Sequence, residues 1–190
     1  MKILVIDNYD SFVFNLVHIL HNIGDLHIDV VKNDKIDIEN VDTYDKILLS
    51  PGPGIPKDAG LIPALINRYK NSKSILGICL GHQAIAESFS SALVNLENPL
   101  HGIASEINVV ADDYLFENIP KQFVVGHYHS WVVDRMPNPD LEVLAYDNSG
   151  NIMALKHKYH DLRGLQFHPE SILTENGIAM ITNWVNHPIL

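Results

Sequence analysis

The sequence is poor in cysteine and in basic residues. A single cysteine, Cys79, stands among the 190 residues, so no disulfide can form within the chain. That count fits a reducing compartment, or a cysteine kept for chemistry. Lysine and arginine number 13 against 23 aspartates and glutamates, a formal net charge of −10. This acidic balance argues against a nucleic-acid partner and against docking on an anionic membrane surface.

Long hydrophobic runs are missing as well. No apolar stretch approaches the roughly 18 residues of a membrane span. The apolar stretch at the start of the chain ends at Asp7 and is too short for the core of a signal peptide. We therefore expect a cytoplasmic location and no membrane partner. With 46% hydrophobic and 19% charged residues, the chain can bury a full core as one domain, residues 1–190.

The first half alternates between two kinds of hydrophobic pattern. Apolar, β-branched runs predict buried strands, and helical spacing of apolar residues predicts the helices between them. The strands are expected at 2–6, 27–31, 46–49 and 74–79, and the helices at 12–23, 61–69 and 81–89. Such alternation is typical of βαβ units and a parallel sheet.

The second half changes character. Its short apolar stretches, separated by Pro, Asn, Asp and Gly, predict strands joined by hairpins that extend the sheet. They lie at 103–110, 123–126, 131–133, 141–145, 152–155 and 164–167. A closing helix is expected at 174–185, with Thr174 as its cap. The predicted fold class is α/β: an open, mostly parallel sheet flanked by helices, with antiparallel additions.

Cys79 lies where a predicted strand meets a predicted helix. Gly77 and Gly81 stand two positions to either side of it, a spacing that permits the sharp turn of a nucleophile elbow. A helix N-terminus favours the thiolate, and the backbone N–H of Leu80 is well placed to stabilise an oxyanion. A lone cysteine is more often a small buried hydrophobe, but the glycine spacing favours a nucleophile.

A thiol nucleophile needs a base, and the base needs a group that orients it. His168-Pro169-Glu170 follows the apolar segment 165–167, so it comes at a strand end, where ligands gather in α/β sheets. The chain has 11 histidines, and a solvated loop histidine is the alternative. The sheet-end position and the Cys79 elbow together favour His168 as base and Glu170 as its orienting group.

Two further segments carry weaker signals. The loop Pro51-Gly52-Pro53-Gly54 also follows a strand, and its backbone N–H groups could face a carboxylate or an oxyanion; a rigid surface turn is the alternative. His127 and His129 would share one face of an extended strand and could form part of a metal site. No third acid or thiol ligand is near them in sequence, so we predict no metal.

Motifs in order along nearly the whole chain resemble those of the class I glutamine amidotransferases. The match is to the branch of the glutaminase subunits of anthranilate synthase and aminodeoxychorismate synthase. The motifs are the opening segment 6–12, the loop 50–54, the elbow 77–83, the strand 128–130 and the His–Glu segment 164–171. The family often has Arg before Tyr-His-Ser and Leu after it, where this chain has His127 and Trp131. These departures leave the catalytic set intact.

The resemblance implies a role for individual residues. Cys79 would be the nucleophile, His168 the base and Glu170 its orienting group, with no cofactor in this subunit. Gly52 and Leu80 would supply the oxyanion N–H groups. The glutamine pocket would be lined by Gly52, Pro53, Gly54, Gln83, Ser130 and Trp131.

The implied function is hydrolysis of the side-chain amide of L-glutamine. Ammonia would pass to a larger, chorismate-binding synthase subunit, with anthranilate as the favoured product. The same subunit serving aminodeoxychorismate synthase stays open, as does a stand-alone cysteine hydrolase of γ-glutamyl compounds. A non-catalytic binding module is disfavoured because Cys79, His168 and Glu170 are all present.

Overall fold

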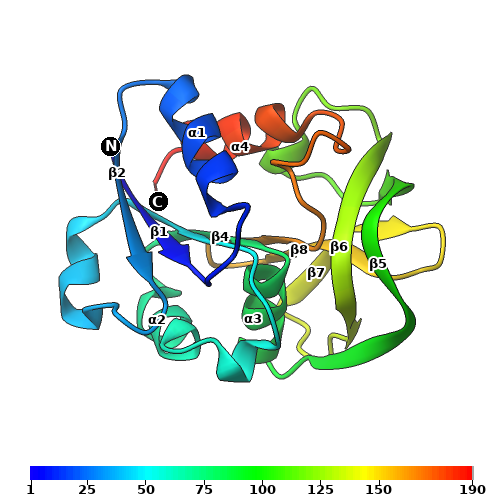
Figure 1. The fold of residues 1–190 in the computed structure, drawn as a ribbon, viewed down its shortest axis with the longest axis horizontal. Coiled ribbons are helices and arrows are strands. Elements are labelled where there is room, and N and C mark those ends of the chain that lie inside the picture. The colour runs from blue at the N-terminus through cyan, green and yellow to red at the C-terminus, as the bar shows by residue number, and fades with distance from the viewer. Residues whose placement is uncertain (190) are drawn as a thin grey trace.

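The computed structural model describes residues 1–189, which form one sheet of nine strands (Figure 1). The strand order is β2-β1-β3-β4-β9-β8-β7-β5-β6. The parallel strands are β1 (Lys2–Asp7), β2 (His27–Lys32), β3 (Lys46–Leu49), β4 (Ser74–Ile78) and β9 (Leu162–Leu165). The antiparallel part adds β5 (Ala92–Val109), β6 (Gln122–Arg135), β7 (Leu141–Asp147) and β8 (Ile152–His157). The predicted α/β class is confirmed.

Helices cover the parallel part of the sheet on both faces (Figure 1). On one face lie α1 (Val13–Ile23) and α4 (Gly177–Asn186), and on the other α2 (Ile62–Tyr69) and α3 (Leu80–Ser88). Side chains alternate across β1, so Ile3 and Val5 join the core under α1 and α4, while Leu4 and Ile6 join the core under α2 and α3. No helix within residues 1–189 is both long enough and apolar enough to cross a membrane.

Short 3₁₀ helices interrupt three of the connections. They are η1 (Ile38–Thr43), η2 (Pro56–Asp58) and η3 (Tyr114–Phe116). None was expected from the sequence, because such short turns leave no periodic pattern of apolar residues.

The antiparallel part differs from its prediction in extent. The segments 123–126 and 131–133 belong to one strand, β6, and β5 begins at Ala92, well before the expected residue 103. β5 is mostly exposed along its first residues and its pairing with β6 shifts register between Asn95 and Leu100. An exposed, irregular strand lacks the apolar alternation on which the prediction depended.

The start of the last helix is a further correction. Thr174 does not cap α4; the N-cap is Asn176, in the left-handed region at φ 58°. The Thr174 hydroxyl instead donates to the His168 carbonyl at 2.6 Å. The Thr174 side chain therefore stabilises the loop that carries the predicted base, His168.

The topology places two parallel strands side by side in the middle of the sheet. β4 and β9 are neighbours, with Ile78 opposite Leu165. Cys79 follows β4 directly and His168 comes shortly after β9. The carboxyl ends of adjacent parallel strands meet at the same edge, so the two residues share one site.

Candidate active site

Cys79 occupies a strained turn between β4 and α3. Its backbone lies at φ 51° and ψ −99°, in the positive-φ region that residues other than glycine seldom adopt. The Cys79 N–H donates to the Leu165 carbonyl at 2.8 Å, and its carbonyl accepts the Gln83 N–H at 3.1 Å. These bonds hold the turn in place at the first turn of α3. Backbone strain of this kind gathers at active sites, where surrounding contacts sustain it.

The flanking glycines are required by close backbone approach. A Cβ on Gly77 would lie 2.4 Å from the Gly81 backbone, and a Cβ on Gly81 would lie 2.6 Å from the Leu49 carbonyl oxygen. Any side chain at either position would push α3 away from the sheet. The geometry is therefore that of the predicted elbow.

His168 and Glu170 form a close pair in the loop after β9. The Nδ1 atom of His168 lies 2.6 Å from Oε1 of Glu170, and both side chains are almost completely buried. Burial lowers the pKa of His168, but the Cys79 thiol and the Glu170 carboxylate outweigh it and raise that pKa well above its ordinary value. The imidazolium is therefore the form of His168 that this arrangement favours.

Two aromatic rings fix the His168 imidazole from the sides. The ring centroid of Tyr128 lies 5.0 Å from that of His168, and the centroid of Phe12 lies 5.7 Å away, both at steep angles. Phe12 precedes α1, so the start of that helix is packed on the predicted base. Sequence reasoning gave Phe12 and Tyr128 no role, although both lie within the quoted motifs.

The loop Pro51–Gly54 is anchored by the end of β1. Asn8 donates from its backbone N–H to the Ser50 hydroxyl at 2.9 Å and from its side-chain amide to the Ser50 carbonyl at 2.8 Å. A Cβ on Gly52 would meet the Asn8 side chain at 2.5 Å and the Leu80 side chain at 2.8 Å. Gly52 and Leu80, the two predicted oxyanion donors, therefore lie against one another beside Cys79.

All of the predicted pocket residues line one cavity. It has a volume of about 140 Å³ and is bounded by Gly52, Pro53, Gly54, Cys79, Gln83, Tyr128, His129, Ser130 and Trp131. The Gln83 amide donates to the Trp131 carbonyl at 2.8 Å and to the Gln166 side chain at 3.1 Å, which ties α3 to β6. Gln166 in turn points its amide at the Cys79 sulfur, 3.6 Å away. The sequence prediction missed Gln166, because nothing in a Leu-Gln-Phe segment marks an inward-facing glutamine.

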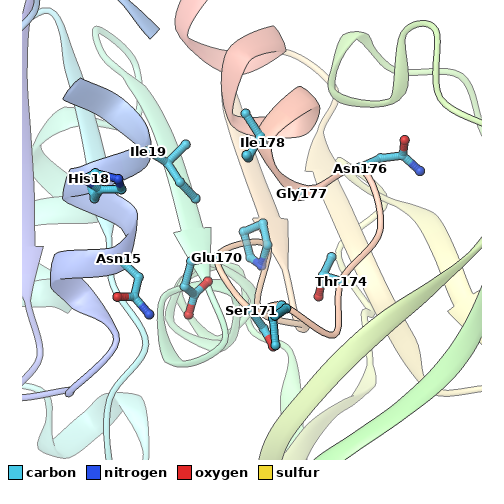
Figure 2. Close-up of a pocket in the computed structure, with 11 residues that line it drawn as sticks. Asn15, His18, Ile19, Glu170, Ser171, Thr174, Asn176, Gly177 and Ile178 are labelled. Atoms are coloured by element: carbon cyan, nitrogen blue, oxygen red, sulfur yellow. The ribbon is translucent and has the colours of Figure 1, made fainter. Parts of the chain in front are cut away.

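A second, larger cavity of about 520 Å³ lies behind the Pro169–Ser171 turn (Figure 2). Asn15, His18 and Ile19 of α1 line one side, and Glu170 and Ile178 lie across from them. Cys79 does not line it. We therefore expect any chemistry of Cys79 to take place in the smaller cavity, which its side chain lines.

His127 and His129 share one face of β6, as predicted for an extended segment. Nδ1 of His127 lies 3.1 Å from Nε2 of His129, and Nε2 of His127 lies 2.7 Å from the Ser105 hydroxyl. Burial lowers the pKa of both, that of His129 to about 3, so both rings are neutral at neutral pH. Among residues 1–189, no group of three His, Cys, Asp or Glu side chains is arranged to hold a metal ion.

Comparison with known proteins agrees with this geometry. A family model described as glutamine amidotransferase class-I matches residues 4–187. Anthranilate synthase component 2 of Lactococcus lactis subsp. lactis is 43% identical over 187 residues, covering 97% of this chain and 93% of that protein. Aminodeoxychorismate synthase component 2 of Klebsiella aerogenes is 38% identical, covering 97% and 99%.

A solved structure supports the fold. A glutamine amidotransferase from Thermotoga maritima superposes with a TM-score of 0.76 at 16% identity, covering 97% of this chain and 80% of that one. Together with the match along almost the whole sequence, the elbow, the His–Glu pair and the glycine loop lead to one assignment. The chain belongs to the class-I glutamine amidotransferase family.

Proposed function

We propose that this chain is the glutaminase subunit of a chorismate-aminating synthase. The observation that carries the proposal is Cys79, held in a strained strand-to-helix turn after β4, while the neighbouring strand β9 leads to His168, whose Nδ1 lies 2.6 Å from Glu170. Relatives named as component 2 of anthranilate synthase and of aminodeoxychorismate synthase support it.

The proposed reaction runs through a thioester. The Cys79 thiolate attacks the side-chain amide carbon of L-glutamine, and the oxyanion accepts hydrogen bonds from the Gly52 and Leu80 N–H groups. The His168 imidazolium gives its proton to the departing nitrogen, so ammonia leaves and the thioester remains. His168 then removes a proton from water, which displaces Cys79 and yields glutamate. None of these steps calls for a metal or an organic cofactor.

The smaller cavity supplies the substrate contacts in this proposal. Gly52, Pro53, Gly54, Gln83, Ser130 and Trp131 surround the Cys79 sulfur, and the backbone polar groups of the loop and of β6 suit the charged end of the amino acid. Glutamine would enter with its amide toward Cys79.

Ammonia is then handed to a chorismate-binding synthase subunit. Anthranilate is the favoured product, and aminodeoxychorismate is the alternative, since relatives at similar identity carry both names. A free thiol used as a nucleophile suits the reducing cytoplasm, where we place the complex.

The experiment is a glutamate-release assay with and without the synthase subunit and chorismate. We expect slow turnover by the isolated chain and faster turnover in the complex, because closure around the acceptor aligns His168 with Cys79. A glutamine-like electrophile should add once, at Cys79, and free glutamine should protect. Fast turnover that ignores the synthase subunit would identify a stand-alone hydrolase instead.

A further inference from the structure

Glutamine hydrolysis that delivers neutral ammonia must also release a proton. In balance, the amide and water yield a carboxylate, NH₃ and H⁺. The following inference rests on the proposed function, because it concerns where that proton goes. If NH₃ passes on uncharged to an acceptor, the proton has to leave the Cys79 cavity by a separate route.

A row of hydrogen-bonding groups leads away from that cavity. His129 lines it and is 7% exposed, and its Nε2 atom lies 3.1 Å from Nδ1 of His127. His127 is completely buried, and its Nε2 atom lies 2.7 Å from the Ser105 hydroxyl. Both distances are those of ordinary hydrogen bonds.

The row ends at another opening in the surface. Ser105 lines a separate cavity of about 350 Å³, together with Glu97, Asp147 and Asn151 among others. The two cavities share no lining residue. We propose that His129, His127 and Ser105 form a proton exit path that connects the Cys79 cavity to the cavity at Ser105.

The chemistry of the groups suits this task. A neutral imidazole accepts a proton at one ring nitrogen and gives up another proton from the second, and a hydroxyl can do the same with its single oxygen. Nδ1 of His129 is buried and has no hydrogen-bond partner within residues 1–189; in the proposal it takes the incoming proton. Nε2 of His129 then passes its proton to His127, and Nε2 of His127 passes its proton to Ser105. The hydroxyl proton of Ser105 goes to water in the outer cavity.

The surrounding charges favour outward movement. On the inner side, burial and the neighbouring His127, His168 and His82 all lower the pKa of His129. On the outer side, burial lowers the pKa of His127, the Asp147 carboxylate acts to raise it, and His168 acts to lower it. A proton is therefore held less well beside the Cys79 cavity than near Asp147.

Ser105→Ala tests the path at its outer end, away from the glutamine contacts. The matched control is Ser105→Thr, which keeps the hydroxyl. Glutamate release is measured for both variants at one pH, first in a dilute buffer of bulky molecules and then in imidazole buffer. In the bulky buffer we expect Ser105→Ala to lose about tenfold in kcat at unchanged KM, less than the ~100-fold or more that follows loss of a direct acid or base. Ser105→Thr should stay near wild type, and imidazole should restore Ser105→Ala.

The outcomes separate the path from the proposed function. A wild-type complex that releases glutamate, together with a complex of the Ser105→Ala variant of equal kcat in the bulky buffer, would overturn the path alone. A lower kcat of Ser105→Ala that imidazole does not raise would also overturn the path, because a small proton carrier does not repair a packing defect. A wild-type complex that releases no glutamate would overturn both.

Discussion

The parallel and antiparallel parts of the sheet are built differently. Every residue of β3 and β4 is buried, whereas β5 is exposed or half-buried over nearly its whole length. The proposed reacting groups, Cys79 and His168, follow parallel strands of the core, while Ser130 and Trp131 lie on β6, which pairs with β5. Dense packing fixes the proposed reacting groups in the parallel part, whereas the candidate pocket wall formed by β5 and β6 has much less of the core behind it.

This contrast is sharpest at the nucleophile. Cys79→Ala should abolish glutamine-dependent product formation, a loss on the order of 10⁴-fold or more, because no second thiol can form the thioester. The reconstituted complex should still make product from an ammonium salt at raised pH, since the synthase subunit's own chemistry is untouched. His168→Ala should behave in the same way. Loss of both activities in Cys79→Ala would mean that the cysteine is structural.

Glycine substitutions compare the packing of the two parts directly. Gly77→Ala, next to the elbow, should lower the free energy of unfolding by about 3 kcal/mol or more, because its Cβ would lie 2.4 Å from the backbone of Gly81. In β5, a Cβ on Gly102 would meet nothing closer than 3.9 Å. Gly102→Ala should therefore lower the free energy of unfolding by only about 1 kcal/mol, because of its φ of +67°. Chemical denaturation of both variants measures the difference. Equal losses would contradict the contrast.

Acid stability probes a buried histidine in each part of the molecule. Burial, followed by neighbouring histidines, lowers the pKa of His129 to about 3 from an unfolded value of 6.5. Below about pH 6.5, His129 is therefore protonated in the unfolded chain but stays neutral in the native state. The free energy of unfolding falls as the pH falls from about 6.5 toward 3. At about pH 5 this one group costs roughly 2 kcal/mol.

Removing that histidine should flatten the profile. His129→Asn should lose less stability between neutral pH and about pH 5 than the wild type, by roughly those 2 kcal/mol. His82→Asn in α3 should do the same, since burial lowers the pKa of His82 to about 4. Denaturation curves at several pH values give the slopes. A profile unchanged in both variants would show that these rings are protonated in the native state.

The smallest effect is expected just beyond the catalytic loop. Ile172 is 99% exposed although it follows the buried Ser171 by one residue, and it lines the cavity of Figure 2. Ile172→Ser should change the free energy of unfolding by no more than about 0.5 kcal/mol and leave the basal glutaminase rate unaltered. Thermal unfolding and glutamate release check both. A larger loss would place this side chain within the packed part of the loop.

The sequence predicts the helices and strands best where buried positions give a clear pattern of apolar residues. β4 and α3 were placed within a residue or so because an all-apolar run meets flanking glycines. The Cys79–His168–Glu170 constellation followed from strand ends that the parallel topology brings to one edge. Their roles in catalysis stay predictions until the variants above are measured.

Two features of the fold could not be predicted from the sequence. β5 contains Pro99 and several exposed polar residues, which read as a loop, and its irregular pairing with β6 accommodates them. Lys46 lies in the buried strand that the sequence predicts, but the sequence does not show that its ammonium group donates to the carbonyls of Trp184 and His187 at 2.5 and 2.7 Å. Contacts between residues so distant in the chain depend on the assembled fold, and no window of sequence contains them.

The backbone angles of Cys79 also limit which nucleophiles this turn can carry. At φ 51° the conformation is already unfavourable for an unbranched side chain. A second heavy atom on Cβ would crowd the neighbouring carbonyls further, so threonine is excluded at this position. Of the two small hydroxyl residues, serine is the one that the turn would admit. Cysteine and serine differ there only in the sulfur or oxygen atom bonded to Cβ. Threonine is excluded by the backbone conformation alone, whatever its reactivity.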